Sequence, residues 1–491
     1  MNLIIVCIDS LRRDHVGCYG NPWIKTPNFD KFGEKASIFN GFNLNAIPTI
    51  PFRRALMLGR EVFPYKDAFA PARNVVSVLG WQPFTNEEMT FQEVLQDAGY
   101  VTGLITDVYH YFRPGMNHYR GFHSWEFIRG QEGDPYRTGA TAQSAEPYLY
   151  PPIQGTRMQN FLEQYLRNIE DRRFEEDYFA AKVFRAAERW LEKNACYYKN
   201  YFLLIDCFDP HEPWDPPREY VDLYDPDYSG KEIIFPQAGT TETLSSAELK
   251  HIRALYAGEV SFVDRWFGKF MEKFYHLGLE KNTAVLFLSD HGHPLGEHQI
   301  IRKIPKALYP ELIDAPFMLY LPNFHGKRNI EAIIQECDIA PTLLKLMAVK
   351  ATESMKGLDF AGVLNNDKME LRKYAAGGYH THAYTRNRKF HYFVNLREPK
   401  ERYLFNLEKD RDMNQNIAET NPAALAIMDD LLKKSMDGWQ LPEKMGGHSY
   451  TMPYIPFALK LRGRNLIRFH PQTPSPLAGE GGGEGDEDEK N

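Results

Sequence analysis

The run Leu3-Ile4-Ile5-Val6-Cys7-Ile8, followed directly by Asp9, is the strongest indication of fold in the sequence. A continuous apolar run of this length is typical of a strand that is buried on both faces of a parallel sheet. The same form recurs at Tyr201–Asp206 and at Thr283–Asp290. Between such strands, apolar residues recur at helical spacing, for example over 179–191. This alternation predicts an α/β fold with a mostly parallel sheet.

Metal-binding residue types stand where two of these strands end. Asp9 follows the first strand, and Asp290-His291-Gly292 follows another. Open α/β sheets bind ligands at the carboxyl ends of their strands, and a glycine lets the backbone turn sharply there. Asp9, Asp290 and His291 therefore form a candidate set of two oxygen ligands and one nitrogen ligand for a divalent metal. The alternative for Asp9 is a cap on the following helix.

A threonine between two prolines opens the segment Pro48-Thr49-Ile50-Pro51-Phe52-Arg53. The prolines restrict the backbone, which predicts Thr49 at the start of a helix from about Phe52 to Leu58. A helix start suits an anionic ester, and the Arg53 guanidinium adds a planar fork for oxyanions. A metal bound at Thr49 would make its hydroxyl a usable nucleophile. The alternative is an ordinary proline-bracketed helix start.

Two basic side chains follow the ends of predicted strands. His211 lies in the proline-rich segment 208–217, and Lys303 follows the Asp290 segment, with Lys306 close behind. Together with Arg53, they could stabilise charge on a transferred group or protonate a leaving oxygen. The predicted reaction is displacement at a tetrahedral anionic centre, either phosphorus or sulfur. The alternative for His211 is an exposed loop histidine.

The composition indicates which binding partners and which cellular compartment to expect. The chain has 491 residues, 43% of them hydrophobic and 25% charged, with a formal net charge of −7, which does not favour nucleic-acid binding. Its five cysteines are scattered, which indicates reduced thiols and a reducing compartment. No run reaches membrane-spanning length and no signal peptide is apparent. We expect a cytoplasmic protein that binds a small anionic ester and neither nucleic acid nor membrane; a homo-oligomer is left open.

Changes in composition and periodicity along the sequence predict three parts. Residues 1–370 are predicted to form the catalytic domain, in which the poorly periodic segment 113–159 is expected to be a long loop that shapes the pocket. Residues 371–470 are predicted to form a small α+β subdomain, with antiparallel strands at 389–394 and 402–407 and a helix at 421–436. The segment 471–491, rich in glycine and acidic residues, is predicted to be a disordered tail.

Taken together, these motifs resemble the sulfatases of the alkaline-phosphatase superfamily over roughly residues 1–430. In chain order the matching landmarks are Asp9, Thr26-Pro27-Asn28-Phe29-Asp30, Thr49–Arg60, Asp209-Pro210-His211, Asp290-His291-Gly292, Asp338–Thr342 and Tyr403–Leu407. The resemblance implies an alkaline-phosphatase-like α/β/α sandwich. It also implies that Asp9, Asp290 and His291 bind the metal, that Thr49 is the nucleophile and that Arg53 supports it. His211 and Lys303 would contact the ester, and His110 would lie near the substrate.

The sequence departs from the family pattern at several positions, among them Phe52, which replaces the small residue of the maturation signature. Ser10 stands where sulfatases commonly have a second acidic residue. The Asp290-His291 pair, in place of Asp-Asn, is similar to the phosphonate monoester hydrolase and phosphodiesterase branch. This pair favours Mn²⁺ or Zn²⁺, with Ca²⁺ or Mg²⁺ as alternatives. Thr49 replaces the cysteine or serine that becomes formylglycine, and a secondary alcohol cannot be oxidised to an aldehyde, so we expect no formylglycine.

The threonine also bears on the substrate. A covalent phospho-threonine can be hydrolysed by water, whereas a sulfo-threonine lacks the hemiacetal route by which formylglycine expels sulfate. We therefore expect a metal-dependent hydrolase of phosphoric mono- or diesters or of phosphonate esters, with Thr49 acting unmodified. The alternatives are a sulfuric ester hydrolase that works without formylglycine, an inactive family member that binds an anionic ligand, and an isomerase or phosphotransferase.

Overall fold

The structure is a computed structural model that describes residues 1–66, 76, 78–139, 145, 148, 157–324, 327–366 and 368–442. The predicted disordered tail at 471–491 lies outside these residues. Within the described part, no helix combines the length and the apolar character needed to cross a membrane.

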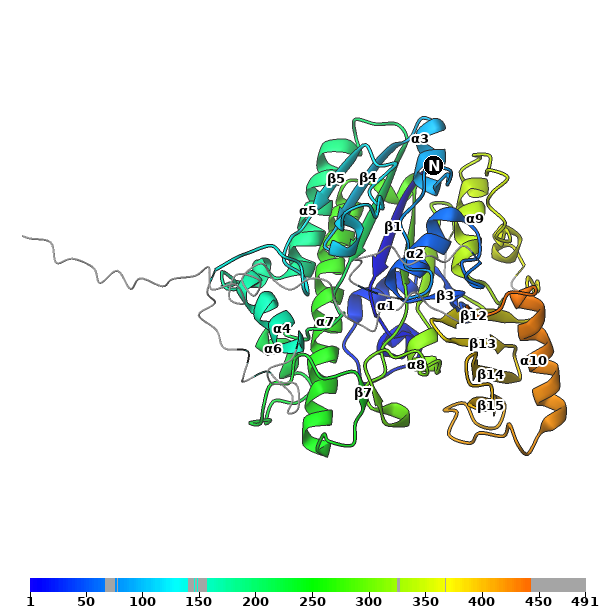
Figure 1. The fold of residues 1–491 in the computed structure, drawn as a ribbon. Coiled ribbons are helices and arrows are strands. Elements are labelled where there is room, and N and C mark those ends of the chain that lie inside the picture. Colours follow the sequence, from blue (N-terminus) through cyan, green and yellow to red (C-terminus); the bar gives the residue numbers. More distant parts are fainter. Residues whose placement is uncertain are drawn as a thin grey trace, which may run out of the picture. The chain divides into compact units, whose positions relative to one another are not determined.

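A sheet of eight strands forms the centre of the catalytic part (Figure 1). Its order is β11-β2-β10-β8-β1-β6-β4-β5. The strands are β1 (Asn2–Ile8), β2 (Ser37–Phe39), β4 (Val101–Thr106), β5 (Ser124–Phe127), β6 (Tyr201–Cys207), β8 (Thr283–Ser289), β10 (Phe317–Tyr320) and β11 (Arg328–Ile330). Strand β10 is antiparallel to both of its neighbours, and the other pairings of this sheet are parallel. The prediction of a mostly parallel sheet is confirmed.

The register of the central strands brings polar residues to one edge. Ile8 of β1 lies opposite Cys207 of β6 and opposite Ser289 of β8. Asp9 therefore follows its strand at the same level at which Asp290 follows β8. Because parallel strands end at the same edge of a sheet, residues 281 positions apart in sequence meet there.

Helices cover both faces of this sheet. The alternate β1 side chains Ile4, Val6 and Ile8 belong to one core, with α5 (Phe179–Asn194) and α7 (Ser246–His276). Leu3, Ile5 and Cys7 belong to the other, with α2 (Thr49–Leu58) and α9 (Ile339–Leu346). Figure 1 shows β1 between these two groups of helices. Helices thus pack on both faces of the sheet, which confirms the predicted α/β/α sandwich. The apolar side chains on both sides of β1 follow from this burial. The other elements of this part are α1 (Pro27–Gly33), α3 (Phe91–Asp97), α4 (Arg157–Asn168), α6 (Arg218–Val221), α8 (Pro310–Ile313), β7 (Gly239–Thr240) and β9 (Ile300–Ile301).

A second sheet anchors the segment that precedes Thr49. Its order is β15-β14-β13-β12-β3, with strands β3 (Ala46–Ile47), β12 (Ala375–Tyr379), β13 (His382–Arg386), β14 (Phe390–Asn395) and β15 (Arg402–Asn406). Strands β14 and β15 pair antiparallel, and α10 (Pro422–Met436) packs against β13 and β14, so the predicted strands and helix are confirmed. Strand β3 pairs in parallel with β12. The domain boundaries at 370 and 470 stay predictions.

Two local predictions differ from the structure. Helix α2 begins at Thr49 itself rather than at Phe52. The segment 113–159 was expected to be loop throughout. Its residues 140–144, 146–147 and 149–156 lie outside the described part, and α4 begins at Arg157. The prediction is also wrong at β5, which pairs in parallel with β4 at the edge of the sheet. This strand is only four residues long and mostly exposed, so it carries no continuous apolar run.

Candidate active site

Asp9, Asp290 and His291 meet at the carboxyl edge of the large sheet. Their potential ligand atoms all lie within 4.8 Å of one another, and all three side chains are fully buried. Asp9 Oδ2 and His291 Nε2 have no hydrogen-bond partner among the described residues. His291 Nδ1 lies 2.8 Å from the Gly292 carbonyl oxygen, which accepts its proton and leaves Nε2 as a lone-pair donor. Unpaired buried polar atoms are costly, so this set fits a divalent cation.

Arg53 links this group to helix α2. Its Nη1 donates to Asp290 Oδ2 at 2.5 Å and to the Thr49 carbonyl oxygen at 3.1 Å. Its Nε and Nη2 donate to the two carboxylate oxygens of Asp206 at 2.9 and 2.6 Å. Its Nη2 also lies 3.1 Å from Asp9 Oδ2 without making a hydrogen bond to it. One buried cation thus faces three buried carboxylates, and a divalent cation would balance the remaining negative charge.

Burial and neighbouring charges shift the pKa values in this group. Burial, reinforced by Asp290, raises the pKa of Asp9 well above its usual range. Burial alone would also raise the pKa of Asp290, but His291 and Arg53 outweigh it and lower that pKa. Burial lowers the pKa of His291 to about 4. His291 is therefore neutral at pH 7, the form in which imidazole binds metals.

Thr49 lies at the start of α2, and Arg53 links its backbone to this group. The residue is 1% exposed, and its carbonyl oxygen accepts the bond from Arg53. The buried Glu336 carboxylate holds the preceding strand by accepting hydrogen bonds from the backbone N–H groups of Asn45 and Ala46 at 2.7 to 2.9 Å. The turn before Thr49 is thus anchored by the small sheet on one side and by Arg53 on the other.

His211 and Lys303 form a close pair. Lys303 Nζ lies 2.5 Å from His211 Nε2, whereas Lys306 is exposed. The His211 ring stacks on Phe208 at 4.1 Å, and its Nδ1 lies 2.7 Å from the Glu212 carbonyl oxygen. Burial lowers the pKa of His211 to about 4, and Lys303 adds to this effect. The neutral ring therefore donates its Nδ1 proton to the carbonyl and accepts at Nε2 from the lysine ammonium.

His110 lies near this pair but apart from the candidate metal ligands. Its ring packs edge-on against Trp81 at 4.9 Å and lies 6.0 Å from the ring of Phe208, on which His211 stacks. Its Nε2 lies 3.5 Å from Glu132 Oε2, and burial lowers its pKa. No hydrogen bond joins His110 to Asp9, Asp290 or His291 among the described residues.

Two buried acids at the site had no role in the sequence analysis. Asp206 binds Arg53 through both oxygens, and Glu212 lies beside His211 and Lys303. A signal for Asp206 was present, because it ends an apolar run just as Asp9 and Asp290 do. No comparable pattern marks Glu212, which looks like one more polar residue in a proline-rich loop.

A second group of potential metal ligands comprises Asp107, Cys207 and Asp209. Its carboxylate oxygens already accept hydrogen bonds: Phe208 N–H and Gln131 Nε2 bond to Asp107, and Gln131 Nε2 and Ala180 N–H bond to Asp209. This group therefore needs no cation to satisfy its oxygens.

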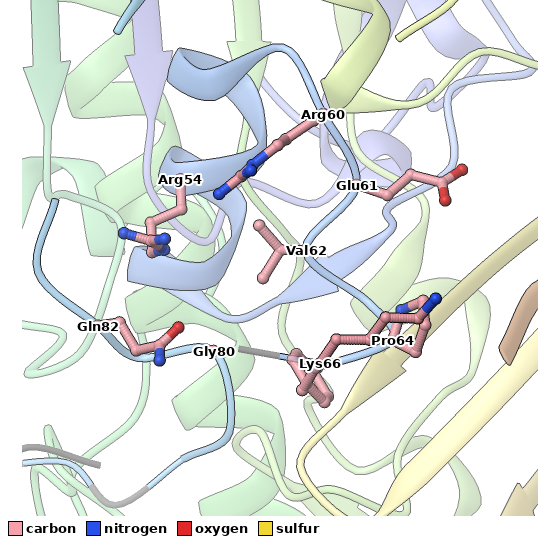
Figure 2. A pocket seen from close by; sticks show the side chains of 9 residues that line it. Arg54, Arg60, Glu61, Val62, Pro64, Lys66, Gly80 and Gln82 are labelled. Carbon is pink, nitrogen blue, oxygen red and sulfur yellow. The ribbon is translucent and has the colours of Figure 1, made fainter. Parts of the chain in front are cut away.

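A pocket of about 200 Å³ lies beside the C-terminal half of α2. Figure 2 shows Arg54 and Arg60 on its helical side, with Gln82 and Lys66 across from them. Both arginines bind the Glu88 carboxylate. None of the candidate catalytic residues lines this pocket, so it is distinct from the site described above.

Comparison with known proteins identifies the family. The family model described as Sulfatase matches residues 1–349, and the one described as N-sulphoglucosamine sulphohydrolase, C-terminal, matches residues 296–440. The chain belongs to the sulfatase family. It is 25% identical to an arylsulfatase of Clostridium perfringens, over 89% of this chain and 94% of the relative. It is 23% identical to human iduronate 2-sulfatase, over 66% of this chain and 60% of the relative.

Solved structures share the fold of this sulfatase-family hydrolase. The phosphonate monoester hydrolase of Agrobacterium radiobacter has a TM-score of 0.67 at 17% identity, covering 88% of this chain and 94% of its own. A protein in complex with its substrate D-glucosamine-2-N,6-O-disulfate has a TM-score of 0.68 at 18% identity, covering 90% and 99%. The alkaline-phosphatase-like fold is therefore confirmed, and both ester classes occur among the neighbours.

Proposed function

We propose that this sulfatase-family hydrolase cleaves phosphoric mono- or diesters or phosphonate esters with unmodified Thr49 as its nucleophile. The observation that carries the proposal is the identity of residue 49, a secondary alcohol at the start of α2 that Arg53 links, through the Thr49 carbonyl oxygen, to Asp290. A secondary alcohol cannot become formylglycine. The covalent ester on this residue must therefore be released by attack at its central atom, which phosphorus permits.

Asp9, Asp290 and His291 would hold the divalent metal, and Thr49 would complete its ligands. Two carboxylates with one imidazole suit Mn²⁺ or Zn²⁺ better than the all-oxygen sites preferred by Ca²⁺ and Mg²⁺. When bound, such a cation lowers the pKa of a coordinated hydroxyl and stabilises negative charge on the ester. Asp9 Oδ2 and His291 Nε2 have no hydrogen-bond partner among the described residues, which supports this assignment.

The chain's own residues supply the remaining steps. Arg53 fixes the start of α2 against Asp206 and Asp290, so that Thr49 Oγ1 is oriented for attack. The hydroxyl proton of Thr49 passes to solvent, a bond forms from Oγ1 to phosphorus, and the bond to the leaving oxygen breaks with its electron pair. The leaving oxygen takes a proton from the His211–Lys303 pair. The pair then accepts a proton from the water that hydrolyses the threonyl ester.

Hydrolysis of sulfate esters without formylglycine is the second candidate. The matched arylsulfatase and the structural neighbour with a sulfated glucosamine favour it. A third candidate is a family member that binds an anionic ligand without turnover. The complete ligand group and the His211–Lys303 pair favour turnover over this third candidate.

A substrate panel separates the three candidates. Wild-type protein loaded with Mn²⁺ or Zn²⁺ would be assayed on an aryl sulfate, a phosphate monoester, a phosphodiester and a phosphonate ester. We expect a phosphorus ester to react fastest and Thr49→Ala to lose about 10³-fold or more, with Thr49→Ser as the conservative control. Mass spectrometry should find a phosphoryl group on the peptide that contains Thr49. Fastest turnover of the aryl sulfate, with full activity in Thr49→Ala, would refute both the substrate class and the nucleophile.

A further inference from the structure

Glu212 is a fully buried carboxylate that follows His211 directly. Arg302 holds its Oε1: the guanidinium Nε donates to it at 2.7 Å, and Nη2 also contacts it. Arg302 is itself fixed, because its guanidinium lies 4.2 Å from the centre of the Phe235 ring. One carboxylate oxygen of Glu212 is therefore bound to a fixed partner, and this contact sets the orientation of the carboxylate.

The other oxygen points into a group of three nitrogens. Glu212 Oε2 lies 3.3 Å from His211 Nδ1, 3.5 Å from His293 Nε2 and 3.7 Å from Lys303 Nζ. It has no hydrogen-bond partner among the residues the structure describes. Its interaction with these groups is therefore one of charge rather than of directed hydrogen bonding. Burial alone would raise the pKa of Glu212, but Arg302 and its other basic neighbours lower it well below the usual range.

The position of this charge matters for the His211–Lys303 pair. The Lys303 ammonium group donates to His211 Nε2, and Lys303 follows Arg302 directly in sequence. Two adjacent, largely buried cations repel each other, and an anion between them offsets this repulsion. Glu212 is that anion, since its two oxygens contact Arg302 on one side and face Lys303 on the other.

We propose that Glu212 is a positioning residue whose carboxylate offsets the repulsion between Arg302 and Lys303 and so holds Lys303 against His211, where the pair can protonate the leaving oxygen. The part that concerns the leaving oxygen rests on the proposed function. The part that concerns the pair's assembly does not. Among the described residues, no hydrogen bond or ion pair joins Glu212 to a candidate metal ligand, so Glu212 acts through Lys303 and His211.

The catalytic test is the dependence of rate on the leaving group. Glu212→Gln keeps the shape of the side chain and removes its charge. We expect kcat/KM to fall about 10²-fold for an ester with a poorly acidic leaving alcohol, and less than about tenfold for one with a strongly acidic leaving phenol. Glu212→Asp should restore part of the loss. In a Lys303→Ala background, Glu212→Gln should cost little more, because the pair is already broken.

The matched control is Glu88→Gln, which removes another largely buried carboxylate shared by two arginines, Arg54 and Arg60. It should leave the leaving-group dependence unchanged. Equal losses on all leaving groups, or a full additional loss in the Lys303→Ala background, would refute the positioning role of Glu212.

An assembly test needs no turnover. In protein with ¹⁵N-labelled histidine, the Nε2 resonance of His211 is identified by its loss in His211→Asn. Because Nε2 accepts a bond from Lys303, we expect its shift to change in the same direction in Glu212→Gln and in Lys303→Ala, and to stay in place in Glu88→Gln. An unchanged shift in Glu212→Gln would overturn the proposal even if the protein hydrolyses esters. A changed shift in a protein without activity would instead leave the assembly role intact and refute the proposed function.

Discussion

Replacing Asp206 by asparagine tests whether the buried pair with Arg53 holds the start of α2. Both side chains are 1% exposed, and the guanidinium binds both carboxylate oxygens at 2.9 and 2.6 Å. Tyr111 also donates its hydroxyl proton to Asp206 Oδ2 at 2.5 Å. Asp206→Asn keeps the size of the side chain and removes the charge that both partners use.

The magnitude follows from two independent estimates. Two unit charges about 4 Å apart interact by about 4 kcal/mol at the effective dielectric constant that suits protein sites. Removing one partner of a buried ion pair costs about 3–5 kcal/mol in mutational studies. Arg53 keeps its contacts with Asp290 and Asp9, so we expect Asp206→Asn to lower the free energy of unfolding by about 3 kcal/mol. Tyr111→Phe removes a single hydrogen bond to a charged group and should cost about 1.5–3 kcal/mol.

The assay is urea denaturation of wild type, both single variants and the double variant after chelation of metal, so that a bound cation adds nothing. Because both changes act on the same carboxylate, the double variant should lose less than the sum of the singles, by about 0.5 kcal/mol or more. The variant Asp206→Asn should also lose at least about tenfold in kcat/KM, because Arg53 orients Thr49 through its carbonyl oxygen. A loss of less than about 1 kcal/mol for Asp206→Asn, with additive effects in the double variant, would refute this account of Arg53.

Two further predictions concern metal and acid. Mn²⁺ or Zn²⁺ at a hundred times its dissociation constant should stabilise the wild type by about 2.7 kcal/mol, seen as a rise in Tm that a chelator reverses. Asp290→Asn should abolish that rise, and an equal rise in this variant would contradict the ligand assignment. Burial lowers the pKa of His391 to about 3, beside Arg386 and Asp314, so the unfolded chain takes up its proton first and stability falls as pH drops below about 6.5. Protonation of this histidine in the unfolded chain should lower the free energy of unfolding by about 1.2 kcal/mol between pH 7 and pH 5.5. His391→Gln keeps a donor for the Leu308 carbonyl oxygen. Urea denaturation at both pH values should show that this variant loses less unfolding free energy between pH 7 and pH 5.5, by that amount.

The sequence predicts the central sheet well because each of its buried strands is a local pattern. Strands β1, β6 and β8 each contain a continuous apolar run, and a strand covered on both faces favours apolar residues on both sides. Their shared edge follows from parallel pairing, which is why Asp9 and Asp290 could be expected to meet before any geometry was known. The start of α2 was misplaced by one turn, because the proline at position 51 lies in the first turn and does not interrupt the helix.

What could not be predicted depends on partners far apart in the chain. Arg53 and Asp206 are 153 residues apart, and no periodicity connects them. The two-residue strand β3 exists only because β12 lies beside it, more than 300 residues later. The four-residue strand β5 is likewise a product of its neighbour β4 rather than of its own composition.

The charge at the site explains why a serine is suitable at position 10. The sulfatase pattern commonly has a second acid there, which would add a fourth carboxylate near one arginine. Ser10 instead donates its hydroxyl proton to Asp9 Oδ1 at 2.8 Å and its backbone N–H to Asp290 Oδ1 at 3.0 Å. It orients two candidate ligands without adding charge, and its backbone reaches them from a left-handed conformation with φ of 59°. With neutral His291 in the set, one divalent cation and Arg53 would together balance the three carboxylates, and no excess negative charge would remain to repel an anionic ester.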